Sequence, residues 1–177
     1  MAILSITRYC LTLIDMRRSL FYLLFQLMLL ISSGQAIDLS QHWQFRQAGK
    51  THWRTAVVPG SVHTDLLRNK LIPDPFFADN ESKLAWIDNV DWEYKTNFSV
   101  TSEMLNNSMA ELHFHGLDTY ADIYLNNSLL FSADNMFRTW KMPIQGSLKP
   151  GKNELRIYFH SAKKRVDSMA KLNLPLT

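Results

Sequence analysis

Three residues near position 63 carry the side-chain types of a hydrolase triad. They are Ser61, His63 and Asp65, all within five positions of the chain. A working triad joins serine to histidine and histidine to aspartate by hydrogen bonds, and it is usually assembled from distant parts of a fold. At the start of a helix, side chains with this spacing point in different directions. The pattern therefore favours a capped surface helix over a catalytic triad.

Two histidines at alternate positions could hold a metal ion. His113 and His115 fall on one face of an expected strand, beside Glu111. A structural zinc site needs four ligands. There is no cysteine nearby and no second histidine pair, so we predict a polar sheet face, with no metal and no cofactor.

Acidic residues gather between positions 79 and 93. Retaining glycosidases need two carboxyl groups about 5–5.5 Å apart, and no local spacing here selects such a pair. We therefore predict that these are solvated loop charges. The acidic residues are Asp79, Glu81, Asp88, Asp91 and Glu93.

Tryptophan is frequent, with five residues in the chain. Aromatic faces can stack on sugar rings, so an exposed tryptophan would suit a carbohydrate surface. Trp92 falls on the apolar side of an expected strand and is predicted to be in the core. Trp86, in an irregular loop over Leu84–Asn89, is the best exposed candidate.

The composition excludes several classes of protein. The 177 residues are 46% hydrophobic and 20% charged, which argues against a disordered chain, a fibre or a polytopic membrane protein. Of 19 basic and 16 acidic residues, three arginines and Asp15 lie within residues 1–36. The remaining 16 basic and 15 acidic groups nearly balance. Since binding to a nucleic-acid backbone needs a concentrated positive face, we predict no nucleic-acid partner. The basic run at 163–165 is interpreted as a solvated end.

The first 36 residues have the pattern of a secretory signal peptide. Met16-Arg17-Arg18 precedes the apolar run Leu20–Ile31, and the small residues Gly34 and Ala36 suit cleavage after Ala36. The run is shorter than the roughly 20 residues that span a bilayer, so we expect no stable membrane anchor. We expect a secreted or periplasmic protein, lysosomal if the host is eukaryotic.

A second methionine, Met16, offers an alternative start for the chain. A signal peptide beginning at Met16 would be complete, so Met16 is a candidate start. The only cysteine, Cys10, would then be absent, and the mature chain has no cysteine in either case. Four Asn-X-Ser sequons follow, at Asn80, Asn97, Asn106 and Asn126. We interpret these as chance products of turns rich in asparagine and serine.

The rest of the chain alternates apolar and polar residues with a period of two. The clearest case is Asp91–Val100, and the same alternation recurs around Leu112, Ile123 and Ile157. Asn126-Asn127 predicts a two-residue hairpin turn, and Lys149–Lys152 predicts another turn. One short helix is expected over Val62–Asn69, with Ser61 as its N-cap. This pattern predicts an all-β protein, a β-sandwich or jelly roll.

Several motifs, in order along the chain, resemble the amino-terminal domain of β-mannosidases of glycoside hydrolase family two. The resemblance covers residues 37–165. The main motifs are Val58-Pro59-Gly60-Ser61-Val62-His63-Thr64-Asp65-Leu66, Pro73-Asp74-Pro75-Phe76-Phe77, Asp91-Trp92-Glu93-Tyr94, Gly116-Leu117-Asp118-Thr119-Tyr120-Ala121-Asp122-Ile123-Tyr124-Leu125-Asn126 and Ala133-Asp134-Asn135-Met136-Phe137.

The resemblance implies a galactose-binding-like jelly-roll sandwich. It also implies an exo-acting enzyme that removes terminal non-reducing β-mannose with two glutamates of a later barrel domain. No residue of this chain matches either glutamate, so mannosides would be bound through a barrel that is missing here. By position in the family, Trp86 and Asn89 are expected at the rim of the mannose pocket.

The resemblance also sets the expected domain limits. Residues 37–166 are expected to form the sandwich domain, incomplete at its closing strand, and residues 167–177 a divergent or truncated tail. The leading interpretation is an amino-terminal, non-catalytic fragment of a secreted β-mannosidase. The alternatives are a free-standing carbohydrate-binding module and a β-sandwich adhesion protein.

Overall fold

The computed structural model describes residues 36–106 and 109–171. The fold below is that of the described residues from Asp38 onward, which belong to one compact unit. The predicted signal peptide, the alternative start at Met16 and Cys10 lie outside the described residues, apart from Ala36. Within the described ranges, no helix is long and apolar enough to cross a membrane.

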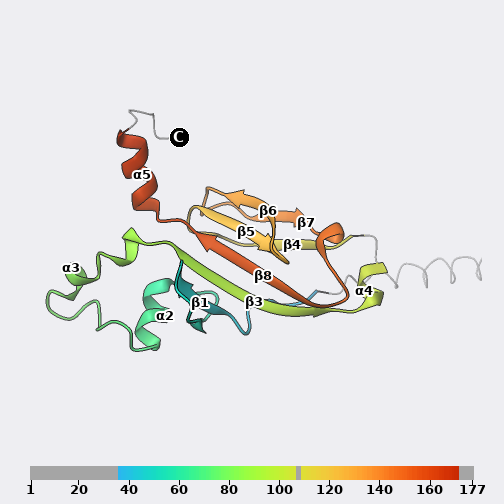
Figure 1. Cartoon of the computed structure of the whole chain (residues 1–177), viewed down its shortest axis with the longest axis horizontal. Coiled ribbons are helices and arrows are strands. Elements are labelled where there is room, and N and C mark those ends of the chain that lie inside the picture. The colour runs from blue at the N-terminus through green and yellow to red at the C-terminus, as the bar shows by residue number, and fades with distance from the viewer. Residues whose placement is uncertain (1–35, 107–108, 172–177) are drawn as a thin grey trace, which may run out of the picture. The chain divides into compact units, whose positions relative to one another are not determined.

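Eight strands form two antiparallel sheets. The larger sheet has six strands in the order β2-β1-β3-β8-β5-β6, and the smaller pairs β4 with β7. Their bounds are β1 Gln44–Gln47, β2 Arg54–Thr55, β3 Trp92–Val100, β4 Glu111–Phe114, β5 Ala121–Leu125, β6 Ser128–Ala133, β7 Trp140–Pro143 and β8 Gly151–Phe159. The long strands β3 and β8 run side by side through the middle of the larger sheet (Figure 1), with Trp92 opposite Phe159.

The core lies between the two sheets. Ile123 and Leu125 of β5 are completely buried, and Leu112 of β4 belongs to the same apolar cluster. Phe131 of β6 joins the sheets, because its ring lies 5.9 Å from that of Phe114 and 5.5 Å from that of Trp140. This arrangement confirms the predicted all-β sandwich.

The alternation read from the sequence is confirmed in the central strands. Trp92, Tyr94 and Thr96 of β3 are buried on one face. Glu93 is the exception, because it is also buried although it belongs to the polar face. The predicted hairpin turn is present: Asn126 and Asn127 have φ values of 51° and 69°, the left-handed conformation that asparagine tolerates.

The predicted helix is present as α2, Val62–Arg68. Ser61 caps it, since its hydroxyl accepts from the Thr64 amide and the Thr64 hydroxyl accepts in turn from the Ser61 amide. Three further short α-helices were not predicted, with two 3₁₀ turns. They are α3 Asn80–Leu84, α4 Ser102–Asn106, α5 Ala162–Lys171, η1 Ile87–Asn89 and η2 Gln145–Ser147.

These helices could not be predicted from the sequence for two reasons, their length and their composition. Helices α3 and α4 have five residues each, too few to show a helical period. Helix α5 has no buried residue, and five of its ten side chains are charged, so its few apolar positions, among them Ala162, Val166 and Met169, did not identify it as a packed helix. The expected domain limit at Val166 falls inside α5.

Candidate functional site

The segment between α2 and β3 carries the two residues singled out for a sugar site. Trp86 immediately precedes η1 and its side chain is 40% exposed. Its ring lies 6.1 Å from that of Trp92, which is buried as predicted. One face of Trp86 is thus supported by the core while the rest is open to solvent, which is an arrangement suited to stacking.

Asn89 lies one turn after Trp86 and is less available. Its side-chain amide donates to the Ala85 carbonyl at 2.7 Å, and its backbone amide donates to the Trp86 carbonyl at 3.0 Å. These bonds fix the 3₁₀ turn that holds Trp86 in place. The structure therefore gives Asn89 a clear supporting contact within this loop.

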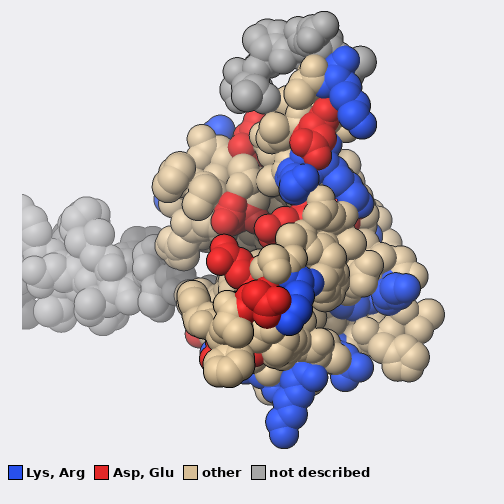
Figure 2. Space-filling view, turned by 90° about the vertical axis from the view of Figure 1, so that its left-hand side faces the viewer, with Lys and Arg blue, Asp and Glu red and all other residues tan. Residues whose placement is uncertain are grey.

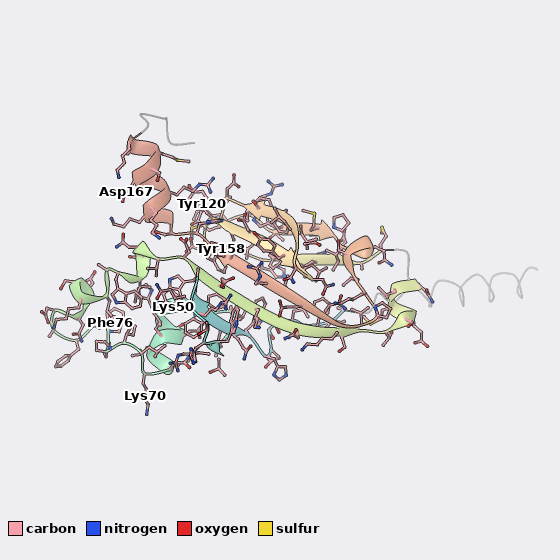
Figure 3. The ribbon with its side chains drawn as sticks, viewed as in Figure 1. Lys50, Lys70, Phe76, Tyr120, Tyr158 and Asp167 are labelled. Carbon is pink, nitrogen blue, oxygen red and sulfur yellow. The ribbon has the colours of Figure 1, made fainter. Side chains whose placement is uncertain are left out.

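Trp86 forms part of the wall of a cleft of about 400 Å³. The cleft lies between the strand pair β1–β2 and the α2–η1 segment, and Lys50 of its rim is marked in Figure 3. The aromatic side chains of one phenylalanine and two tryptophans, three lysine or arginine side chains and one histidine contribute to it, and no aspartate or glutamate does. The lining residues are Phe45, Arg46, Gln47, Lys50, His52, Arg54, Leu66, Leu71, Trp86 and Trp92.

The cleft is electrically positive and rich in hydrogen-bond donors. Arg46 is partly engaged, since its Nε lies 2.6 Å from the Glu93 carboxylate and its guanidinium lies 4.2 Å from the Trp53 ring centroid. Lys50 and Arg54 are exposed, and neither forms an ion pair with any residue in the described ranges. Such a surface can bind hydroxyl or anionic groups beside an aromatic face, but it holds no acid for glycoside cleavage.

The acidic residues predicted as solvated loop charges include two with fixed structural roles. Glu93 is 5% exposed and its carboxylate binds Arg46 and, at 3.0 Å, Arg156. Asp91 accepts from the Tyr158 hydroxyl at 2.9 Å and from the Ser161 amide at 2.8 Å. Partial burial is the largest single influence and raises the pKa of Asp91, but these two hydrogen bonds and the nearby Lys164 and His160 together outweigh it, so the pKa is lowered. Neither residue was recognised from the sequence, because the partners lie far along the chain.

The structure does not assemble a triad from Ser61, His63 and Asp65. Ser61 serves as the helix cap, while Asp65 is completely buried on the other side of α2. The Asp65 carboxylate accepts from the Val57 amide at 3.0 Å and from the Tyr94 hydroxyl at 3.1 Å. Burial and this carboxylate raise the pKa of Tyr94. Asp65 is therefore a buried structural acceptor and not, as expected, part of a surface helix face.

The other candidate sites are polar surface in the structure. His113 lies 3.0 Å from Glu111 through Nε2, on β4. Within the described residues, no group of three or more potential metal ligands comes together. In the basic run at 163–165, Arg165 lies over the Tyr120 ring, 4.4 Å from its centroid, at the base of α5 where Figure 3 marks Tyr120.

A second hollow, of about 290 Å³, was not foreseen. Three asparagines, two lysines and one glutamate line it, at the hairpin between β5 and β6 and the turn before β8. The residues are Asn97, Asn126, Asn127, Lys149, Lys152 and Glu154. It has no aromatic wall, so the Trp86 cleft remains the better candidate for a sugar.

The sandwich and its motifs define a galactose-binding-like domain. The chain belongs to the family described as "Glycosyl hydrolase 2 galactose-binding domain-like", which matches residues 43–174. The match therefore extends beyond Val166, into the segment that we expected to be a divergent or truncated tail.

Named relatives agree with the family. A β-mannosidase B of Thermothelomyces thermophilus is 39% identical over 129 residues, 71% of this chain and 15% of that protein. The β-mannosidase of Mus musculus is 30% identical over 141 residues, 80% of this chain and 16% of that protein. Both matches confirm the resemblance to β-mannosidases.

A solved structure shares the fold. The β-D-mannosidase of Dictyoglomus thermophilum superposes with a TM-score of 0.76 at 40% identity, over 79% of this chain and 17% of that chain. This chain thus spans 15 to 17% of the length of these three relatives.

Proposed function

We propose that this chain is the amino-terminal, non-catalytic domain of a secreted exo-β-mannosidase. The observation that carries the proposal is the combination of a family match with a cleft that has an aromatic wall and no carboxylate. In the proposed enzyme the hydrolytic acids come from another domain, and this domain contributes scaffold and sugar contacts. The substrate would be a terminal non-reducing β-D-mannoside.

The test of this function is the activity of the purified chain. With an aryl β-mannoside it should release no product above the uncatalysed rate, because general acid and nucleophile roles need a positioned pair of carboxyl groups. The Dictyoglomus thermophilum enzyme serves as the positive control. Turnover that disappears on substitution of an acidic residue of this chain would contradict the proposal.

A second candidate is a free-standing carbohydrate-binding module. The half-exposed Trp86 in the cleft favours it, since stacking needs no further domain. Retardation of the chain on a mannan-containing gel, abolished by Trp86→Ala and unaffected by Phe137→Ala, would support the module. Phe137 is 88% exposed and does not line the cleft, so it is a matched control.

Secretion is part of the proposal and has its own test. Export should survive removal of residues 1–15 and should fail when Leu24 and Leu27 are replaced by arginine, because the apolar run would be interrupted. The exported protein should begin near Ile37. A different mature start would overturn the assignment of residues 1–36.

A further inference from the structure

Two neighbouring phenylalanines are displayed on the surface before α3. The side chain of Phe76 is 97% exposed and that of Phe77 is 71% exposed. Figure 3 marks Phe76 on this part of the chain, beside α3. Burying a phenylalanine gains about 1.5–3 kcal/mol relative to leaving it in water. Two adjacent rings in water are therefore a feature that needs an explanation.

The segment that carries them, which we call the phenylalanine turn (residues 73–79), is held in shape by hydrogen bonds. The Phe76 amide donates to the Asp74 carboxylate at 3.0 Å, and the Phe77 amide donates to the Asp74 carbonyl at 3.2 Å. The Asn80 side chain donates to the same carbonyl at 2.9 Å. The rings are thus presented by a preorganised turn, which lowers the entropy lost when they are buried by a partner.

The turn is anchored at both ends in the core. Ile72 before it is 7% exposed, and Leu84 after it is 6% exposed. The segment between them is therefore fixed to the domain at both ends.

Acidic side chains surround the turn along the chain. Asp74, Asp79, Glu81 and Asp88 are exposed, and the one lysine of this stretch, Lys83, pairs with Asp79 at 2.8 Å. Figure 2 views this side of the domain and shows acidic side chains gathered in the middle of the face. The exposed rings therefore share this face with acidic side chains, and apolar groups beside charged ones are typical of protein interfaces.

We propose that the phenylalanine turn docks the domain onto the remainder of a longer polypeptide, in an apolar pocket with a basic rim. The inference rests on the proposed function. The three relatives above have more than four-fifths of their length outside the matched region. We place the partner pocket in the corresponding part of the longer polypeptide. A second copy of the chain is a poorer occupant, because it would place one acidic rim against another.

The phenylalanine turn lies on the same segment of the chain as Trp86. Only α3 separates the phenylalanine turn from Trp86 along the chain. Fixing Phe76 and Phe77 in a neighbouring domain would therefore hold Trp86 at the junction of the two domains. The docking surface positions the sugar contact and takes no part in the chemical step.

The test compares the free chain with a chimera in which residues 38–171 replace the matched part of the Dictyoglomus thermophilum β-D-mannosidase. The double substitution Phe76→Ser with Phe77→Ser should lower the Tm of the chimera by several degrees. It should change the Tm of the free chain much less, because there both rings are mostly exposed to solvent. The control is Phe137→Ser, an equally exposed ring on the β6–β7 loop, which should be neutral in both proteins.

Amide hydrogen exchange gives a second readout. Exchange over residues 73–79 should be about tenfold or more slower in the unsubstituted chimera than in the free chain. If the chimera does not fold, the double substitution is made at the aligned positions of the intact Dictyoglomus thermophilum enzyme and Tm is measured there. Equal effects of the double substitution and the control substitution would overturn the proposal.

The remaining outcomes separate the docking surface from the proposed function. Slowed amide exchange of residues 73–79 in a chimera that does not cleave β-mannosides would support docking through the phenylalanine turn. The same result would contradict the proposed role as a β-mannosidase domain. A dimer of the free chain in sedimentation, abolished by the double substitution, would identify a second copy as the occupant and overturn the proposal.

Discussion

The side-chain amide of Asn126 donates a hydrogen bond of 2.8 Å to the side-chain oxygen of Asn153. This bond ties the β5–β6 hairpin to the first residues of β8. Asn153 is completely buried and is also bonded to Lys149 and Gly151, so all its hydrogen-bonding groups are engaged. The two asparagines together close one end of the larger sheet.

Replacing Asn153 by alanine should strongly destabilise the domain. The change removes the bonds that Asn153 makes to Asn126, to the Lys149 amide and carbonyl and to the Gly151 carbonyl, at a cost of roughly 2–4 kcal/mol for several partly buried hydrogen bonds. Urea unfolding of the full chain, followed by tryptophan fluorescence, measures this loss. Asn97→Ala, at an exposed position of β3, is the control and should change the free energy of unfolding by less than about 0.5 kcal/mol.

The same network should keep the sequon at Asn126 free of glycan. Its side-chain nitrogen also donates to the Ser147 carbonyl at 3.1 Å, and its oxygen accepts from the Glu154 amide at 3.1 Å. A sugar on this nitrogen would displace these partners. When the chain is produced in a glycosylating host, peptide mass spectrometry of the folded protein should find Asn126 unmodified. A folded protein with a full complement of glycan at Asn126 would contradict this expectation.

Removing the Glu93 carboxylate should also destabilise the fold. Glu93→Ala leaves Arg46 and Arg156 side by side without their shared counter-ion, and we expect a loss of about 2–4 kcal/mol because the arginines are only partly exposed. The matched control is Asp79→Ala, which breaks the exposed pair with Lys83 and should cost at most about 0.5 kcal/mol. Denaturant unfolding distinguishes the two. Similar losses for both variants would show that Glu93 is no more than a surface charge.

The fold could be predicted where a strand shows one face to the core. The alternation in β3 and β5 and the two-asparagine turn are local signals, and the structure reproduces them. Strands β1 and β2 have four and two residues, too few for a period to show. Their place in the sheet depends on pairing with β3, which no local pattern reveals.

The candidate site could be predicted only in part, for the same reason. Exposure of Trp86 follows from its loop. The basic wall of the cleft is formed by Arg46, Lys50 and Arg54, which approach Trp86 only in the folded domain. The hydrogen bond from the Asn89 side chain to the Ala85 carbonyl could not be predicted from the sequence either, because an asparagine side chain in a loop can point to solvent or to the backbone.

Acid and alkali should each weaken the bond between Asp91 and Tyr158. The lowered pKa of Asp91 means that the folded chain binds fewer protons than the unfolded chain between the folded pKa and the unfolded value of about 3.9, so this stability is present above the unfolded value and is lost as pH falls through the folded pKa. Burial and the Asp91 carboxylate raise the pKa of Tyr158 to about 12. Its contribution is complete below the unfolded value of about 10 and is lost as pH rises toward 12.

The substitution Tyr158→Phe tests the alkaline part. It removes the titrating hydroxyl, so the loss of stability between about pH 10 and 12 should become smaller than in the unsubstituted chain. Thermal unfolding across this range is the measurement. Tyr120→Phe is the control, because Tyr120 contacts Arg165 through its ring and keeps that contact. An unchanged alkaline profile in Tyr158→Phe would assign the titration to other groups.

Within the proposed enzyme, Trp86 should contribute to substrate binding and not to the chemical step. In an active chimera with the Dictyoglomus thermophilum enzyme, Trp86→Ala should raise KM for a mannoside about three- to tenfold, the loss expected for one aromatic stacking contact, with kcat little changed. Asn89→Ala should have a smaller effect on KM, arising from loosening of the 3₁₀ turn, because its amide is bonded to Ala85. Trp86→Phe keeps an aromatic face and should recover most of the affinity. A purely structural role would instead lower the Tm of Trp86→Ala and leave KM unchanged, and that result would make the loop a connector.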